Sequence, residues 1–350
     1  GFEVEILDLL VAKYSAAKIR RKLEEYGPQV VGTTCVTMTF PTAAKILRVC
    51  KDFDPGIFTV IGGPHVSFAI DDTLRRAPWI DIVVSGEGER TMIELTRALE
   101  EDADLSQVAG IAFRKNQMVV KTAPRAAIED LDELPFPARY LLPLSKYRAL
   151  GAPCTVISTR GCPYSCIFCT AHRMFGRRVR FRNPKLVVDE IESLHRGFGF
   201  PQINIVDDTF TLNHKHVTAI CQEIIHRNLN IQWNVFSRVD TLSRPLLELM
   251  KEAGCAWALF GVESGSQQIL DTVKKGITLD GVRKGAKLAA EVGINTFASF
   301  ILGLPGETPE SARKTVAFAR ELNQDYGAKY GFHLLSPFPG TEVYEEAERY

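Results

Sequence analysis

Short apolar segments alternate with amphipathic, helix-like segments along most of the chain, and this alternation constrains the fold more than any other feature of the sequence. Strands separated by helices form parallel sheets whose faces the helices cover. The sequence therefore predicts an α/β protein. The expected strands lie at residues 4–10, 30–36, 58–61 and 80–84, and then at 155–158, 203–206, 231–236, 256–261, 296–302 and 330–335.

Residues 104–150 interrupt the alternation and divide the chain. They contain a predicted hairpin around Lys115 and Asn116 and the stretch Leu134-Pro135-Phe136-Pro137, in which each proline disfavours helix at the residue before it. We expect a doubly wound, Rossmann-like domain over 1–103, a hairpin and linker over 104–150, and a partial six-stranded (β/α) barrel over 151–350. Because the chain opens at Gly1 and ends in a helix-like segment, we expect the first domain to lack its first strand and the barrel to be truncated at the C-terminus.

The composition is that of an ordinary globular protein. Of the 350 residues, 45% are hydrophobic and 24% are charged, and the formal net charge is zero, so no charge excess indicates nucleic acid as a partner. No apolar run approaches the roughly 20 residues of a transmembrane helix, and no signal-peptide pattern opens the chain. Free thiols on a chain without a secretory segment favour the cytoplasm.

Three cysteines, Cys162, Cys166 and Cys169, follow the strand expected at 155–158 with the spacing C-x3-C-x2-C. Thiolates are the usual ligands of iron–sulfur clusters, and a cubane normally takes four, so three ligands leave one iron open. A closed zinc site needs a fourth ligand, and the chain has no second C-x2-C pair. The remaining cysteines are scattered and indicate buried apolar positions: Cys35, Cys50, Cys154, Cys221 and Cys255.

The segment Ser158–Cys169 closely resembles the cluster-binding loop of the radical S-adenosylmethionine enzymes. The resemblance implies the partial barrel, a 4Fe–4S cluster held by the three cysteines, and S-adenosylmethionine chelating the open iron through its amino and carboxylate groups. It further implies an electron donor such as flavodoxin or ferredoxin. The implied activity is reductive cleavage of S-adenosylmethionine to a 5′-deoxyadenosyl radical, which abstracts hydrogen from a substrate.

The resemblance also implies which side chains contact S-adenosylmethionine, and most of them follow directly after an expected strand. Phe168 would lie against the adenine, although plain packing also explains it. Arg238 suits the cofactor carboxylate, and a structural ion pair explains it nearly as well. The full set of implied contacts is Phe168, Asp207, Asp208, Arg238, Glu263 and Ser264.

In the first domain, segments 62–67 and 80–89 resemble the cobalamin-binding domain that precedes the radical barrel in one large subgroup. The glycine pair 62–63 allows backbone to approach a ligand closely. The Asp-x-His-x-x-Gly motif of classical cobalamin domains is not found, so a Rossmann-like domain that only shapes the substrate site stays an alternative. The implied cobalamin contacts are Thr34, Gly62, Gly63, Pro64, His65, Gly86, Glu87, Gly88 and Glu89.

Together these resemblances imply cobalamin-dependent methylation of an unactivated carbon in a small-molecule or lipid substrate. Two alternatives stay open: a radical oxidative or ring-closing enzyme of the same architecture, and a cobalamin or redox sensor. The polar residues at the strand ends disfavour the sensor, which needs no second ligand beside its cluster. A methylthiotransferase is disfavoured, because that family has three further cysteines in its N-terminal domain and only Cys35 and Cys50 precede the linker here. The basic run 173–182 would suit an anionic substrate or RNA, but net neutrality favours a solvated surface.

Overall fold

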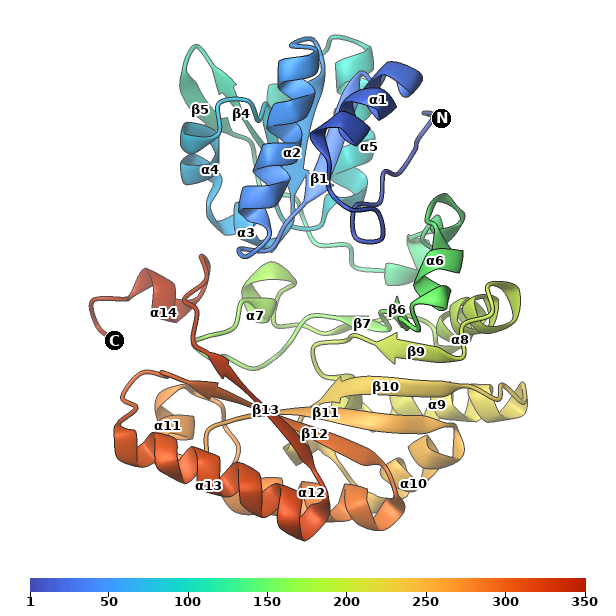
Figure 1. Ribbon diagram of the computed structural model, residues 1–350, viewed down its shortest axis with the longest axis vertical. Helices are drawn as coiled ribbons and strands as arrows, with labels where there is room; N and C mark the ends of the chain where they lie inside the picture. The colour runs from blue at the N-terminus through green and yellow to red at the C-terminus, as the bar shows by residue number, and fades with distance from the viewer. The chain divides into compact units, whose positions relative to one another are not determined.

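The computed structural model describes all residues, Gly1–Tyr350, which divide into two compact units (Figure 1). The first unit comprises Gly1–Ile128 with Arg173–Phe175 and Phe338–Glu345. The second comprises Glu129–His172, Gly176–Pro337 and Glu346–Tyr350. Each unit has its own sheet and its own hydrophobic core, and each is described separately.

The first unit is built on a five-stranded sheet in the order β1-β2-β3-β4-β5. Strands β1 to β3 are parallel, and β4 and β5 form an antiparallel hairpin at one edge. The strands are β1 (Val30–Thr34), β2 (Phe58–Gly62), β3 (Ile82–Val84), β4 (Ile111–Lys115) and β5 (Met118–Lys121). The helices are α1 (Ala16–Tyr26), α2 (Phe40–Phe53), α3 (Pro64–Phe68), α4 (Ile70–Arg76) and α5 (Gly88–Glu100).

Both faces of this sheet are apolar, because successive side chains of a strand point to opposite sides. Ile61 and Val83 join one core cluster with residues of α2 to α4. Their neighbours Val60, Ile82 and Val84 join a second cluster with Leu95 of α5. Helices therefore cover both faces, and the predicted doubly wound α/β fold is confirmed.

Two expectations for the first unit were wrong. Residues 4–10 form no strand, since no neighbouring strand pairs with them, and Val4 and Leu10 are 56% and 88% exposed. The hairpin around Lys115 and Asn116 is not part of a linker. It continues the sheet, because Phe113 of β4 pairs with Ile82 of β3.

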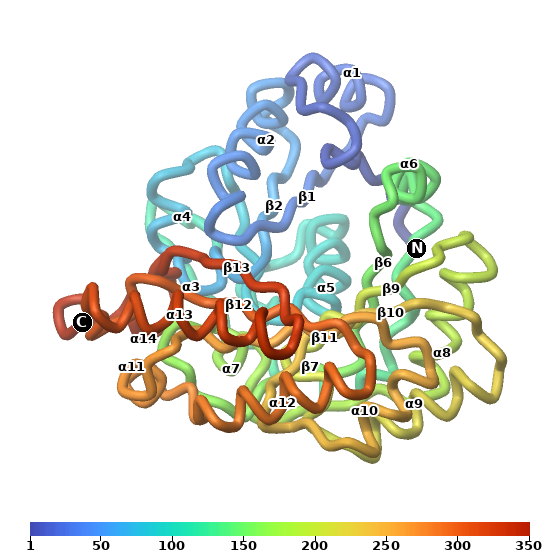
Figure 2. Tube along the Cα trace, turned by 60° about the horizontal axis from the view of Figure 1, so that its bottom comes forward, coloured from blue at the N-terminus to red at the C-terminus, as the bar shows by residue number.

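The second unit contains six parallel strands in the order β13-β12-β11-β10-β9-β6, so that neighbours in the sheet are also successive along the chain. Figure 2 follows them across the molecule from β6 to β13. Strands β6 and β13 do not pair, so the sheet is an open, partial barrel, as predicted. The strands are β6 (Cys154–Val156), β9 (Gln202–Ile205), β10 (Gln232–Ser237), β11 (Cys255–Glu263), β12 (Asn295–Leu302) and β13 (Lys329–Leu334), with a small ribbon of β7 (Thr159–Arg160) and β8 (Arg180–Phe181).

The helices that follow these strands pack on one face of the sheet around buried side chains such as Trp233, Phe260 and Phe300. Two of them begin with a side-chain cap followed by proline: Asn183 accepts from the amide of Lys185 in α8, and Thr308 accepts from the amide of Ser311 in α13. No helix in the protein has the length and apolar character needed to cross a bilayer.

The remaining helices complete the element order. They are α6 (Leu144–Ala149), α7 (Ala171–Met174), α8 (Pro184–Glu192), α9 (His214–His226), α10 (Arg244–Glu252), α11 (Gln267–Thr272), α12 (Leu279–Val292), α13 (Pro309–Tyr326) and α14 (Glu342–Glu345). A π-helical turn, Ser193–Gly197, extends α8, and short 3-10 turns lie at Leu105–Gln107, Leu131–Glu133, Arg139–Leu141, Phe210–Leu212 and Val239–Thr241.

Candidate functional site

The three motif cysteines lie on a loop whose two ends are held together by the β7–β8 ribbon. Thr159 pairs with Phe181 and Arg160 with Arg180, and the amide of Cys162 donates to the carbonyl of Gly176 at 3.2 Å. Gly161 has φ +105° and lies where the two sides of the loop approach each other closely. A Cβ at this position would lie 2.6 Å from the carbonyl oxygen of Arg178, so only glycine lets the two sides of the loop meet here.

The three thiols are close enough to interact electrostatically. A negative charge on Cys162 raises the pKa of Cys166, and charges on Cys166 and Cys162 raise the pKa of Cys169. Burial is the largest cause in each case and raises the pKa of Cys169 to about 11, whereas the positive charges of Lys275 and Arg238 lower the pKa of Cys166. Arg238 also lowers the pKa of Cys162, so two of the three thiols lie near a positive charge, which favours the thiolate form that binds a cluster.

No three His, Cys, Asp or Glu side chains converge as ligands of a single metal ion would. A closed zinc site takes four ligands that meet at one point, about 2.0–2.3 Å from the metal. A cubane takes each thiolate on a different iron, and three thiolates leave one iron open. The donor set of Cys162, Cys166 and Cys169 fits such a cluster.

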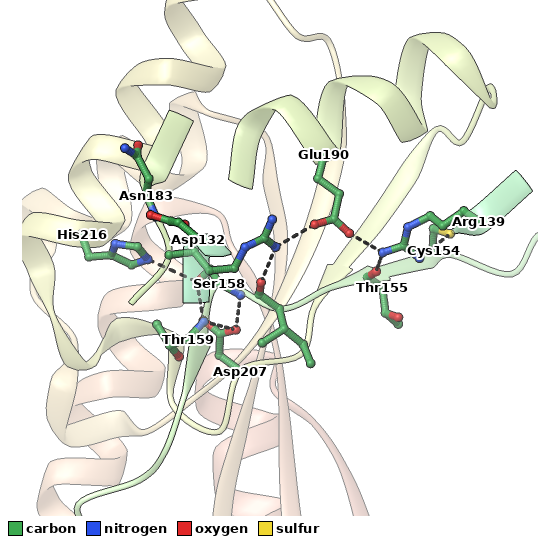
Figure 3. Close-up of polar contacts among 12 residues, drawn as sticks. Asp132, Arg139, Cys154, Thr155, Ser158, Thr159, Asn183, Glu190, Asp207 and His216 are labelled. Carbon is green, nitrogen blue, oxygen red and sulfur yellow. Dashed lines mark hydrogen bonds and ion pairs between the residues drawn. The ribbon is translucent and has the colours of Figure 1, made fainter. Parts of the chain in front are cut away.

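Asp207 and Asp208 follow β9, and the structure separates their roles. Asp207 is 2% exposed, and its carboxylate accepts from the amides of Ser158 and Thr159, at 2.7 and 3.1 Å, and from the Ser158 hydroxyl (Figure 3). Burial nevertheless raises the pKa of Asp207 to about 6. This carboxylate therefore ties the end of β9 to the chain leaving β6, and its lone pairs are used within the protein.

Asp208 remains accessible to solvent, and no protein group bonds to its carboxylate in the structure. Its charge raises the pKa of both Cys162 and Cys169, which places it beside the cysteine loop. The surrounding protein also desolvates it and raises its own pKa. Of the two aspartates, Asp208 is the one available to a bound ligand.

Arg238 follows β10 and is 5% exposed. Its guanidinium donates to both carboxylate oxygens of Asp240, at 3.0 and 2.9 Å, and to the carbonyl of Lys275 at 2.9 Å. The Tyr164 ring lies 3.5 Å below it, a cation–π contact. The ion pair that the sequence left open is therefore present, and it fixes the guanidinium next to Tyr164 of the cysteine loop.

Glu263 ends β11 in a left-handed backbone conformation, φ +70°, at a β-bulge. Its carboxylate accepts from the ammonium of Lys275 at 2.8 Å, and both side chains are more than nine-tenths buried. A Cβ on Gly261 would lie 2.2 Å from Oε1 of Glu263 and 2.9 Å from Nζ of Lys275. The missing side chain of Gly261 thus leaves the space that the buried ion pair occupies.

Lys275 is the site residue that the sequence reading missed. Its ammonium lies 6.0 Å from the centre of the Phe168 ring, and its charge acts on Cys166. The segment around it also contacts the cysteine loop, because the carbonyl of Val273 accepts from the amide of Ile167 at 3.2 Å. Lys275 follows a short helix, α11, rather than a strand, so a search confined to strand ends could not find it. Nothing in the sequence distinguishes Lys275 from its neighbour Lys274, and only its burial in the structure identifies it.

Ser264 is fully buried. Its hydroxyl lies 3.2 Å from that of Thr315 in α13 and accepts from the amide of Ser266 at 3.1 Å. These contacts hold the turn after β11 in place, so Ser264 acts on the site through the position it gives to Glu263.

The basic run 173–182 is largely neutralised by carboxylates. Arg182 and Arg139 both donate to Glu190 of α8, which is 3% exposed (Figure 3). Arg178 donates to Glu129 at 2.7 Å, and Arg177 donates to the Ser165 hydroxyl at 2.7 Å. These contacts hold the arginines of the run against the residues around the cysteine loop.

In the first unit, the residues that the resemblance assigns to cobalamin gather at the carboxyl ends of β1, β2 and β3, the usual ligand edge of such a sheet. Gly63 has φ +103°, and a Cβ there would lie 2.4 Å from the carbonyl oxygen of Cys35 and 2.7 Å from Oγ1 of Thr34. The close approach that Gly63 serves is therefore between the ends of β1 and β2. A Cβ on Gly62 would meet ordinary contacts only.

Other residues of this edge are held by internal hydrogen bonds. His65 is bonded through Nδ1 to the Thr37 hydroxyl at 3.1 Å, and burial lowers its pKa. Glu87 accepts from the amide of Ile128 at 2.7 Å, and the amide of Gly86 donates to Ser67 at 3.1 Å. Pro64 opens α3, Gly88 opens α5 and Glu89 is exposed in its first turn.

The loop after β1 leaves apolar surface uncovered at the same edge. Val36 and Met38 are 50% and 80% exposed, and Thr34 beside them is also accessible. Exposed apolar side chains next to a strand-end ligand edge fit a large, partly apolar ligand such as a corrin.

Comparison with known proteins agrees with both halves of this description. Residues 156–319 match the family model of the radical SAM superfamily, and residues 1–96 match that of the B12 binding domain. Two solved structures share the fold. They are TsrM, a radical S-adenosylmethionine methyltransferase from Kitasatospora setae (TM-score 0.85, 24% identity, all of this chain and 70% of that one), and OxsB, a cobalamin-dependent radical enzyme (TM-score 0.84, 20% identity, 99% and 56%).

Sequence relatives cover nearly the whole chain. The chain is 38% identical over 346 residues to the uncharacterized methyltransferase PH0819 of Pyrococcus horikoshii. The aligned region covers 99% of this chain and 75% of that protein. The chain is also 34% identical over 353 residues to the anaerobic magnesium-protoporphyrin IX monomethyl ester cyclase of Rubrivivax gelatinosus, of which it spans 63%. The chain belongs to the radical S-adenosylmethionine enzymes that carry an N-terminal B12-binding domain.

Proposed function

We propose that this protein methylates an unactivated carbon of a small-molecule or lipid substrate, using S-adenosylmethionine, a 4Fe–4S cluster and cobalamin. The observation that carries the proposal is the gathering of Asp208, Glu263 and Lys275 around the three cysteines. It gives one free carboxylate and one buried ion pair beside the thiols. A sensor needs a cluster site but has no use for polar groups of both signs next to it.

The cysteine thiolates would hold the cluster, and the neighbouring groups would hold S-adenosylmethionine. Asp208 suits the ammonium group of the cofactor, because it is the free carboxylate beside the loop. Phe168, close to Lys275, suits the adenine, and the Glu263–Lys275 pair suits hydroxyl and carboxylate groups. When bound, the cluster and S-adenosylmethionine supply a carbon radical that abstracts hydrogen, and cobalamin supplies a methyl carrier.

The protein contributes rigidity and orientation around those groups. Arg238 is fixed from three sides, by Asp240, by the carbonyl of Lys275 and by the Tyr164 ring. Asp207 fixes the start of the cysteine loop through two backbone amides. Side chains whose positions are set before ligands bind need no reorganisation during the reaction, which is the main way a protein assists chemistry carried by a cofactor.

Cobalamin would bind at the strand ends of the first unit, between Thr34, the turn at Gly63 and the Gly86–Glu89 turn. The match of residues 1–96 to the family model of the B12 binding domain supports this assignment, and the name of a relative 26% identical, the hopanoid C-3 methylase of Methylococcus capsulatus, supports methyl transfer. All eight cysteines are free thiols, which supports a reducing compartment such as the cytoplasm, where flavodoxin or ferredoxin would supply electrons.

A second candidate is an oxidative or ring-closing reaction without methyl transfer. The 34% identity to the Rubrivivax cyclase favours it. Both candidates need the same cysteines and the same S-adenosylmethionine site, and they differ in whether cobalamin carries a methyl group to the product.

The experiment is anaerobic reconstitution of the full chain with iron, sulfide and hydroxocobalamin, followed by reduction in the presence of S-adenosylmethionine. We expect four irons and one cobalamin per chain, and 5′-deoxyadenosine as product. The triple variant Cys162→Ala/Cys166→Ala/Cys169→Ala should lose iron and product together. The control Cys50→Ala, which changes a buried cysteine of the first unit, should keep both. Deoxyadenosine from the triple variant would refute the proposal, and iron without cobalamin would favour the second candidate.

A further inference from the structure

The helices of the second unit pack on one face of its sheet, and the side chains of the other face lie outside that core. Residues such as Val235, Phe260 and Ala298 belong to the helix-packed core, so their neighbours along each strand point the other way. The interior of a complete (β/α) barrel is filled by such side chains. Here Phe236 and Ile157 on this second face are 44% and 39% exposed, so apolar side-chain surface on it stays uncovered.

These two exposed residues and three half-buried ones form one apolar row across the sheet. Phe236 of β10 pairs with Leu259 of β11, and Leu259 pairs with Phe297 of β12. Val206, two residues after Asn204 of β9, and Ile157, two residues after Thr155 of β6, continue the row, because Asn204 and Thr155 are themselves paired. We name these five residues (Ile157, Val206, Phe236, Leu259 and Phe297) the apolar belt.

Polar rows bound the apolar belt on both sides. Two residues further along the strands come Asp208, Arg238 and Gly261, which belong to the cofactor site. Two residues before the belt, Asn234 donates to Asn204 at 2.9 Å, and its own carbonyl oxygen has no donor. At about 4.8 Å between strands and 3.3 Å per residue, the belt is roughly 19 Å wide and 7 Å high, the size of two to four fused rings.

Charged groups are almost absent from the row itself. The position next to Phe297 on the edge strand is Lys329, and its ammonium lies 4.8 Å over the Trp257 ring. An ionic group placed on the apolar belt would lose its hydration without gaining a partner, at a considerable cost in free energy. An uncharged apolar group would instead cover exposed aromatic surface and gain the hydrophobic free energy of that burial.

We propose that the apolar belt holds the substrate, and that the part held there is an uncharged, apolar ring system whose target carbon faces the adjoining row of Asp208 and Arg238. This inference rests on the proposed function, because it assigns a substrate class to the same site. It commits to a small molecule as the occupant, since the belt is continuous with the cofactor residues one row away.

The test is equilibrium dialysis of the reconstituted full chain against three fluorescent probes: 2-naphthol, which is neutral at pH 7.5, the anion 2-naphthoate, and the cation 2-naphthylmethylammonium. We expect 2-naphthol to bind at least tenfold more tightly than either ion. Phe236→Asn and Ile157→Asn should each weaken it fivefold or more. Both positions are exposed, so neither change removes core packing. The matched control is Leu334→Asn, on the opposite face of β13 and 79% exposed, which should bind 2-naphthol like the wild type.

Equal binding of 2-naphthol by the wild type and both belt variants would overturn the inference, and so would preferred binding of either ion. The probes need no cleavage of S-adenosylmethionine. Failure of the wild-type chain to form 5′-deoxyadenosine would therefore overturn the proposed function, and the dialysis result would still decide whether the apolar belt binds uncharged rings.

Discussion

At the scale of single residues, Glu263 combines an unfavourable backbone conformation with an unfavourable burial of charge. A non-glycine residue with positive φ costs about 1–3 kcal/mol, and burying a carboxylate without a partner costs more. Both costs are present at Glu263, which has φ +70° and is 7% exposed. Lys275 offsets the second cost by neutralising the carboxylate at 2.8 Å. Strain of this kind at a strand end indicates a position selected for function.

The first prediction concerns this pair. Lys275→Met should lower the free energy of unfolding by about 3 kcal/mol, because breaking a buried ion pair leaves one charge without a partner. The double variant Lys275→Met/Glu263→Gln should lose clearly less than the sum of the two single losses, since neither charge then remains. Urea unfolding followed by tryptophan fluorescence measures all three variants.

Lys314→Met supplies the control for that cycle. Lys314 pairs with Glu310 at 2.8 Å, but the two side chains are 59% and 75% exposed, and such surface pairs contribute about 0–1 kcal/mol. Strictly additive losses at Lys275 and Glu263 would show that the two side chains do not stabilise one another.

The second prediction concerns Gly161, where the two sides of the cysteine loop meet. Gly161→Ala should abolish most of the iron bound after reconstitution, because its Cβ would lie 2.6 Å from the Arg178 carbonyl oxygen and the loop would have to open. Gly176→Ala lies on the same loop and also at positive φ, but its Cβ would meet nothing within 4 Å. Iron and sulfide analysis should therefore find Gly176→Ala near wild type, and equal iron in both variants would contradict the steric argument.

At the scale of elements, the sequence predicted the strands of the second unit to within about two residues and left its connections open. Each predicted strand from 155 to 335 is a strand in the structure, and alternate residues of β6 and of β9 to β12 pack against the helices. The strand-end rule also located Asp208, Arg238 and Glu263. It could not find Lys275, which a loop brings back to the site, nor distinguish Asp207 from Asp208, because their roles depend on which one reaches the amides of Ser158 and Thr159.

Residues 4–10 illustrate a different kind of failure. Their alternation is strand-like, but a strand also needs a neighbour, and the pattern of one segment carries no information about pairing. The hairpin at 111–121 was predicted correctly as a hairpin but was assigned to the linker for the same reason. Only the pairing of β3 with β4 shows that it belongs to the first domain.

The third prediction concerns the junction of α9 with the ends of β6 and β9. His216 of α9 is 7% exposed and lies 3.4 Å from the Ser158 hydroxyl, which in turn donates to Asp207. Burial lowers the pKa of His216 to about 4. The unfolded chain therefore binds more protons than the folded chain between about pH 4 and 6.5, and stability should fall as the pH is lowered through this range.

For His216 alone, this loss amounts to about 2 kcal/mol between pH 7 and pH 4.5. His216→Phe should reduce the loss by a comparable amount, which urea unfolding at the two pH values measures. Asp207 acts in the opposite direction, since its raised pKa makes its contribution fall as the pH rises from about 4 to 6. For this reason the difference between wild type and variant is the quantity to compare. An unchanged pH dependence in His216→Phe would mean that the imidazole has the same pKa in the folded and the unfolded chain.

At the scale of the whole molecule, the two units have separate cores and separate candidate ligands. Leu47 and Val83 belong to a cluster confined to the first unit, and Trp233 and Phe300 to one confined to the second. A compact unit with its own core can unfold on its own, so a ligand should stabilise the unit that binds it. This separation makes the assignment of cobalamin to the first unit measurable without any substrate.

The last prediction uses calorimetry of the reconstituted chain. We expect hydroxocobalamin at 100 times its dissociation constant to stabilise the first unit by about 2.7 kcal/mol and to raise only its unfolding transition. Leu47→Ala, which removes a side chain that is 0% exposed, should lower the same transition, since such truncations cost about 2–5 kcal/mol. Met250→Ala, at an equally buried position of the second unit, should lower the other transition. If hydroxocobalamin instead raised the transition that Met250→Ala lowers, the cobalamin site would belong to the barrel, and the strand ends of the first unit would need another ligand.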